Sequence, residues 1–174
     1  MPGSDAERHP LLSAQNLPRT SRFEEALYSL GDEWEVIEGV QLGHFTGLYA
    51  FLSVHGVFVV FPQSHYGVVD HYRYRLVIEG ENLSRVAEAI LKTTQNLGRV
   101  VGCKVTGIML HRQLVDADEA RDGFTDHNHP REWTFIGVKL MTWESFGPRL
   151  KSLRQVELTE DEVKNVRLRL RSLR

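Results

Sequence analysis

Residues 82–98 read NLSRVAEAILKTTQNLG, and this stretch decides the class of fold. Its apolar side chains recur at intervals of three and four residues, which is the spacing of one face of an α-helix. Asn82 can serve as the N-cap, and Gly98 is a residue on which the helix can end. The stretch therefore predicts an amphipathic helix over residues 82–97 that lies across a sheet. The side chains that we expect to be buried include Val86, Ile90 and Leu97.

The sequence on either side of this helix predicts β-strands. Between residues 34 and 62, aromatic and β-branched residues dominate and glycines recur among them, as is typical of short strands joined by tight turns. Similar runs follow before and after the helix. The expected strands are 34–41, 47–54, 57–62, 71–79, 103–113 and 133–144. A polar loop over 116–130 separates the last two strands.

Two further helices are expected near the ends of the chain. A short helical stripe over 21–30 precedes the first strand and stops at Gly31. Near the C-terminus, Thr159 and Glu162 have the spacing of a capping box, which marks the start of a helix. One face of this last helix is apolar and consists of Val163, Val166, Leu170 and Leu173.

Strands and helices in this order, without regular βαβ alternation, predict an α+β fold. We expect an antiparallel or mixed sheet of about five to six strands, with amphipathic helices packed mainly on one face. Residues 1–19 contain three prolines and no apolar periodicity, so we expect a flexible N-terminal segment there. Residues 20–174 then form a single domain that ends in a basic amphipathic helix.

Composition restricts the classes of function. A net charge of −2 excludes a uniformly basic nucleic-acid binder, although 16 arginines against 5 lysines are a marked bias. Cys103 is the only cysteine, which excludes an internal disulfide and a cysteine-based zinc site. No apolar run approaches the ~20 residues that cross a membrane, and the N-terminus does not resemble a signal peptide. We therefore expect an intracellular protein, cytoplasmic or nuclear, that is not bound to membranes.

The sequence His71-Tyr72-Arg73-Tyr74-Arg75 is the most informative polar segment. On one continuous strand, Tyr72 and Tyr74 would share a face with Leu76 and Ile78, and His71, Arg73 and Arg75 would form a cationic face opposite. Guanidinium groups on an open face can hold phosphates, while Tyr66 or His71 at the edge can stack on a base. Alternatively, these arginines pair with acids on neighbouring strands.

The C-terminal helix carries a second group of basic residues. Residues 164–174 hold five bases and no acid. The bases are Lys164, Arg167, Arg169, Arg171 and Arg174. Helix electrostatics alone favours acids at the start of a helix and bases at its end, so this distribution can be purely structural. Its density also suits a phosphate backbone or an acidic protein groove.

Catalytic motifs are scarce. In Asp126-His127-Asn128-His129, two histidines one residue apart can point toward a shared ion on an extended segment, but two ligands do not complete a metal site. We favour the alternative, a solvated acidic loop whose histidines cap or hydrogen-bond locally. Cys103 resembles a buried, inert thiol more than a nucleophile. We therefore assign no catalytic residue, metal ligand or cofactor from the sequence.

These observations leave three hypotheses. The first is a non-enzymatic protein that binds a polyanion, with RNA the best candidate, as a monomer or a homodimer. Its expected contact residues are His71, Arg73, Arg75, Lys164, Arg167, Arg169 and Arg171. The second is a regulatory module whose apolar C-terminal stripe docks on a protein partner or on a second copy. The third is a metalloenzyme built around His127 and His129.

Overall fold

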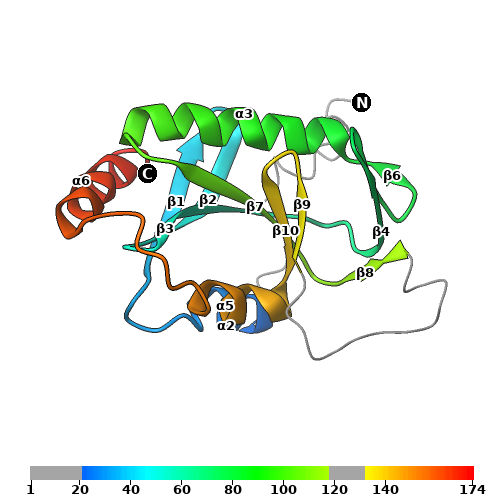
Figure 1. The fold of residues 1–174 in the computed structure, drawn as a ribbon, viewed down its shortest axis with the longest axis horizontal. Coiled ribbons are helices and arrows are strands. Elements are labelled where there is room, and N and C mark those ends of the chain that lie inside the picture. The colour runs from blue at the N-terminus through cyan, green and yellow to red at the C-terminus, as the bar shows by residue number, and fades with distance from the viewer. Residues whose placement is uncertain (1–20, 118–131) are drawn as a thin grey trace.

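The computed structural model describes residues 21–117 and 132–174, and it confirms the α+β fold class. The described residues form a sheet of six strands, a second sheet of four strands and four helices (Figure 1). Five of the six expected strands lie in the larger sheet, whereas the sixth, expected over 71–79, lies in the smaller sheet, which was not expected. None of the helices in these two ranges is both long and apolar enough to cross a membrane.

The larger sheet is parallel in its centre and antiparallel toward its edges. In spatial order its strands are β1 (Glu35–Leu42), β2 (Phe45–Ser53), β3 (Gly56–Pro62), β7 (Val105–His111), β10 (Val138–Thr142) and β9 (Glu132–Phe135). Strands β3, β7 and β10 run parallel to one another. Because parallel neighbours cannot be joined by a tight turn, the chain crosses from β3 to β7 through the smaller sheet and α3 (Ser84–Val101).

The smaller sheet extends from the end of the larger one at which β3 and β7 finish (Figure 1). Its strands, in spatial order, are β6 (Glu81–Asn82), β5 (Arg75–Ile78), β4 (Gly67–Tyr72) and β8 (Leu114–Asp116). The first turn of α3 is bonded to β5, because Leu83 N donates to Leu76 O at 2.8 Å and Leu76 N donates to Ser84 Oγ at 2.9 Å. Strand β5 of the smaller sheet is therefore fixed to the start of α3.

Helices cover both faces of the larger sheet. The two longest, α3 and α6 (Glu160–Arg171), share one hydrophobic core with the sheet. On the other face, α2 (Ser21–Tyr28) and α5 (Trp143–Lys151) enclose a second core around Phe51 and Ile108 (Figure 1). We expected helices mainly on one face. Strand β2 is apolar on both sides, and a strand of this kind requires cover on both.

Helix α3 has the predicted buried face but ends later than predicted. Ile90 and Leu97 are buried, and Val86 is half-buried against the same core. The helix continues past Gly98 and ends at Gly102, which has a φ of 79° in the left-handed region. Gly98 instead allows close packing, because a Cβ atom there would lie 2.8 Å from the Cys103 carbonyl oxygen.

The segment after residue 132 differs most from the prediction. In place of one strand over 133–144, β9 and β10 form a hairpin and α5 begins at Trp143. Thr142 Oγ1 accepts a hydrogen bond from Ser145 N at 3.1 Å, and Ser145 Oγ accepts one in return from Thr142 N at 3.1 Å. This capping box ends the strand and starts the helix.

Candidate nucleic-acid interface

The predicted cationic strand is in fact the tip of a hairpin. Strand β4 ends at Tyr72 and β5 begins at Arg75, so Arg73 and Tyr74 form a two-residue turn. The prediction of one strand over 71–79 is therefore wrong, and so is the separation of its side chains onto two faces. The error arose because the alternation of tyrosines and aliphatic residues continues through the turn, and no glycine, asparagine or proline marks it.

The hairpin tip, residues 71–75, is exposed, whereas Leu76 and Ile78 after it are buried. Tyr72 is 61% exposed and Tyr74 is 75% exposed. The three predicted contact residues of the tip, His71, Arg73 and Arg75, are also exposed. By contrast Leu76 is fully buried and anchors the base. The arrangement presents two aromatic rings and three basic side chains to solvent on one short element.

The acids of the smaller sheet do not neutralise the tip. Asp70 Oδ2 accepts from Tyr72 Oη at 3.1 Å, and Glu79 Oε2 accepts from Val68 N at 2.7 Å. The Glu81 carboxylate pairs with the His65 ring. The expected alternative, in which strand arginines pair with neighbouring acids, does not occur in the described part of the chain.

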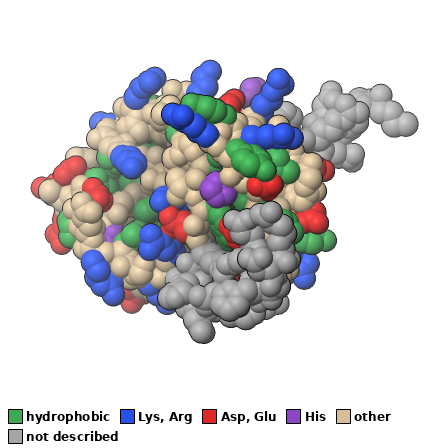
Figure 2. Space-filling model, turned by 45° about the vertical axis from the view of Figure 1, so that its right-hand side comes forward, with side chains coloured by type: hydrophobic (Ala, Val, Ile, Leu, Met, Phe, Trp, Pro, Cys, Tyr) green, Lys and Arg blue, Asp and Glu red, His purple; other side chains and the backbone are tan. Residues whose placement is uncertain are grey.

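The two arginines of the tip remain available to a ligand. Within the described residues neither Arg73 nor Arg75 forms an ion pair, and the Arg73 guanidinium carbon lies 5.2 Å from the centre of the Tyr74 ring. Figure 2, turned so that the smaller sheet comes forward, shows basic and hydrophobic side chains interspersed over this face. A surface of this kind can bind phosphates and stack on bases at the same time.

Three arginines of the C-terminal helix are bonded to other parts of the same chain. The Glu35 carboxylate accepts from Arg167 Nε and from an Arg171 guanidinium nitrogen, the latter at 2.7 Å. Arg169 donates to the Val100 carbonyl at 2.5 Å. Only Lys164 among the four predicted tail contacts is exposed and makes no hydrogen bond or ion pair within the described residues.

The tail and the hairpin tip do not form one surface. Helix α6 lies at the opposite end of the molecule from β4 and β6 (Figure 1). Its position is fixed by the apolar stripe, since Val163, Val166 and Leu170 are 9%, 2% and 0% exposed and belong to the α3 core. The stripe that we expected to dock on a partner is therefore occupied by the chain's own core.

A row of polar residues, which sequence reasoning missed, crosses the carboxyl ends of the parallel strands; Gln63 and His111 are buried and Thr142 is half-buried. Thr142 lies beside His111 in the β10–β7 register, and Gln63 N donates to Leu110 O at 2.8 Å at the end of β3. His111 is fully buried, and its Nδ1 lies 2.7 Å from the His65 carbonyl oxygen. Burial lowers the pKa of His111 to about 4. The only signal in the sequence is a histidine that ends an apolar strand.

The described residues provide no evidence for a metal site or for a reactive nucleophile. Within them, no three histidine, cysteine, aspartate or glutamate side chains are grouped so that they could hold a metal ion. His127 and His129 lie outside the described residues. Burial raises the pKa of the half-buried Cys103 thiol, with Glu162 adding to the effect, so this thiol is a poor nucleophile at neutral pH.

Comparison with known protein families, with curated proteins and with solved structures finds no match to this chain. The fold and the site therefore define only a class, an α+β protein with an exposed aromatic and basic hairpin tip.

Proposed function

We propose that this protein binds single-stranded nucleic acid, with RNA as the first candidate, through the hairpin tip. The observation that carries the proposal is that Tyr72 and Tyr74 are largely exposed beside arginines that have no ion-pair partner in the described residues. Exposed large aromatic rings cost solvation free energy, so their presence on a surface favours a binding role over a structural one.

Single strands suit this geometry better than a duplex does. Unpaired bases of any sequence can stack on the tyrosine rings, because every base has an aromatic face. Arg73 and Arg75 can then reach the phosphates on either side of the stacked bases. His71 adds a third polar contact, on β4 one residue before the strand ends. The tail helix is not part of the proposed interface, because Arg167, Arg169 and Arg171 are bonded within the fold.

The test measures binding of a fluorescent 12-nucleotide polyuridine by anisotropy, at salt concentrations from about 50 mM upward. Arg73→Gln with Arg75→Gln should weaken binding and reduce the slope of log K against log salt by about 1.4, or about 0.7 for each phosphate contact on a single strand. Tyr72→Ala with Tyr74→Ala should weaken binding at least tenfold at every salt concentration, because each stacked base contributes about 1–3 kcal/mol.

The matched control is Lys104→Gln with Lys151→Gln, which removes the same charge from exposed positions outside the tip. It should leave both affinity and salt slope close to those of the wild type. Wild-type protein that binds neither single- nor double-stranded RNA at about 50 mM salt would end the proposal. So would a double arginine variant that binds no more weakly than the control.

A further inference from the structure

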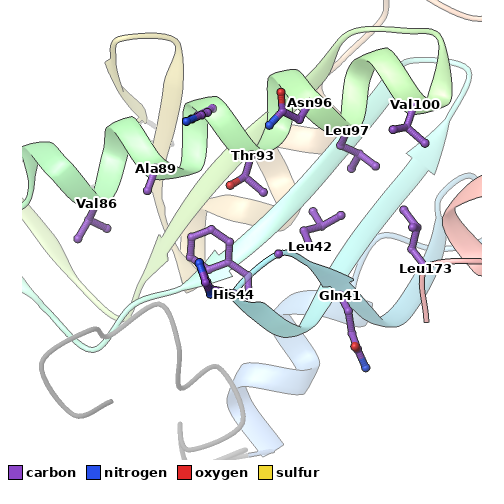
Figure 3. A pocket seen from close by; sticks show the side chains of 13 residues that line it. Gln41, Leu42, His44, Val86, Ala89, Thr93, Asn96, Leu97, Val100 and Leu173 are labelled. Carbon is purple, nitrogen blue, oxygen red and sulfur yellow. The ribbon is translucent and has the colours of Figure 1, made fainter. Parts of the chain in front are cut away.

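A second site lies between α3 and the turn that joins β1 to β2, and it does not depend on the proposed function. There the surface encloses a cavity of about 560 Å³ (Figure 3). Leu42, Phe45 and Leu97, which are all buried, line it together with Leu173 near the C-terminus. Figure 3 shows the side chains of Val86, Ala89 and Thr93 directed from α3 toward the β1–β2 turn.

The cavity is apolar except for a few basic and neutral polar groups. Lys92 is the only lysine or arginine among its lining residues, and no aspartate or glutamate lines it. Within the described residues Lys92 forms no ion pair, even with Glu88 one helical turn earlier. His44 lines the same cavity from the turn, and the Thr93 hydroxyl makes no hydrogen bond within those residues. The site thus has a cation without a counterion beside an apolar interior.

The size of the cavity favours a small molecule over a protein. Binding sites for small ligands occupy roughly 300–1,000 Å³ and are mainly apolar with a few polar groups. Stable protein interfaces use about 20–30 residues on each side, whereas 13 residues line this cavity. Val100 at its edge is 55% exposed, which leaves an apolar side chain in water until a ligand covers it.

We propose that this cavity binds an organic anion with one carboxylate and a medium-length hydrocarbon chain. The chain packs on Leu42, Phe45 and Leu97, and the carboxylate lies at Lys92 with the Thr93 hydroxyl as a second donor. Each additional buried methylene should tighten binding about fourfold, since it contributes about 0.8 kcal/mol. The Lys92 ammonium should select the carboxylate over neutral and cationic head groups of the same chain length.

The test measures binding of octanoate, decanoate, 1-decanol and decyltrimethylammonium by titration calorimetry. Decanoate should bind roughly fifteenfold more tightly than octanoate, and at least tenfold more tightly than the alcohol or the cation. Lys92→Gln should weaken decanoate about tenfold and leave 1-decanol unchanged. Lys151→Gln on α5, on the opposite face of the sheet, is the matched control and should change neither.

Two variants test the cavity itself. Ala89→Trp fills it and should abolish binding of both decanoate and 1-decanol. Val100→Glu places a negative charge, the same sign as that of the ligand, at the edge of the cavity and should weaken the binding of decanoate at least tenfold. Because Val100 is exposed, this variant provides the test if Ala89→Trp does not fold. Equal affinity for decanoate and decyltrimethylammonium, or decanoate binding that Val100→Glu and Lys92→Gln leave unchanged, would overturn the proposal. RNA binding by the hairpin tip is measured separately, so each proposal can fail without the other.

Discussion

The buried His111 should make the stability of this protein depend on pH in a defined range. Its Nδ1 must carry the hydrogen, because the His65 carbonyl, 2.7 Å away, can only accept. Its Nε2 is buried and has no hydrogen-bond partner in the described residues. Protonation there would place a charge in the interior, away from water, and burial accordingly lowers the pKa to about 4 from the usual 6.5.

The sign of the effect follows from the two pKa values. Between pH 6.5 and pH 4 the unfolded chain binds a proton at His111 and the folded chain does not. The contribution of His111 to stability is therefore greatest above pH 6.5 and falls as the pH is lowered toward 4, by about 1.4 kcal/mol for each pH unit. Over the whole range His111 should reduce the free energy of unfolding by about 3 kcal/mol, and below pH 4 its effect no longer grows.

The assay is urea unfolding at pH 7.5, 6.5, 5.5 and 4.5, followed by circular dichroism and tryptophan fluorescence. His111→Asn keeps a donor toward the His65 carbonyl but does not titrate, so its free energy of unfolding should fall less steeply between pH 6.5 and 4.5 than that of the wild type. His71→Asn, at an exposed position of the hairpin tip, is the control and should follow the wild type. Equal slopes for wild type and His111→Asn in this range would refute the reasoning.

Two further predictions concern the packing of α3. Ile90 is fully buried in the core, so Ile90→Ala should lower the free energy of unfolding by about 2–5 kcal/mol in urea titrations; a loss below about 0.5 kcal/mol would contradict this placement. Gly98→Ala would bring a Cβ to 2.8 Å from the Cys103 carbonyl oxygen, so the crowding should outweigh the helix propensity gained and cost about 1–3 kcal/mol. Gln95→Ala, at an exposed position of the same helix, should be nearly neutral.

Local signals in the sequence predicted the elements that they control directly. The spacing of apolar residues located α3, and the Thr159 capping box located α6, where Thr159 Oγ1 accepts from Glu162 N at 3.1 Å. Both are contacts between residues a few positions apart. The same kind of signal was present at Thr142 and Ser145, but the aromatic and β-branched residues around them favoured a strand, and the helix was missed.

Turns likewise divide into those with a local sequence signal and those without one. The β5–β6 turn at Glu79 and Gly80, and the β9–β10 turn at Ile136 and Gly137, have positive φ at both positions, and each contains the glycine that such turns favour. The turn at Arg73 and Tyr74 has no positive φ, so nothing in its composition distinguishes it from a strand. Only the pairing of β4 with β5 reveals it.

Interactions between distant segments account for the rest. Glu35 is 132 residues from Arg167 in the chain, and their ion pair removes the tail from the predicted interface. The burial of His111 depends on packing around three parallel strands, which no local pattern encodes. The residues of the hairpin tip were identified from their chemistry, whereas their arrangement in space required the pairing of the strands.

Substitutions in the hairpin tip should leave the rest of the hairpin folded, so their effect on binding can be separated from any effect on the fold. The base is held by Leu76 and Ile78, both fully buried, and by two hydrogen bonds that join the Leu76 backbone to Leu83 N and Ser84 Oγ at the start of α3. Arg73 and Arg75 contribute no ion pair to the described structure, and their side chains lie in solvent. Their replacement should therefore leave the free energy of unfolding within about 0.5 kcal/mol of the wild-type value. A loss of RNA binding in that variant would then report on the contact with the ligand and not on the fold.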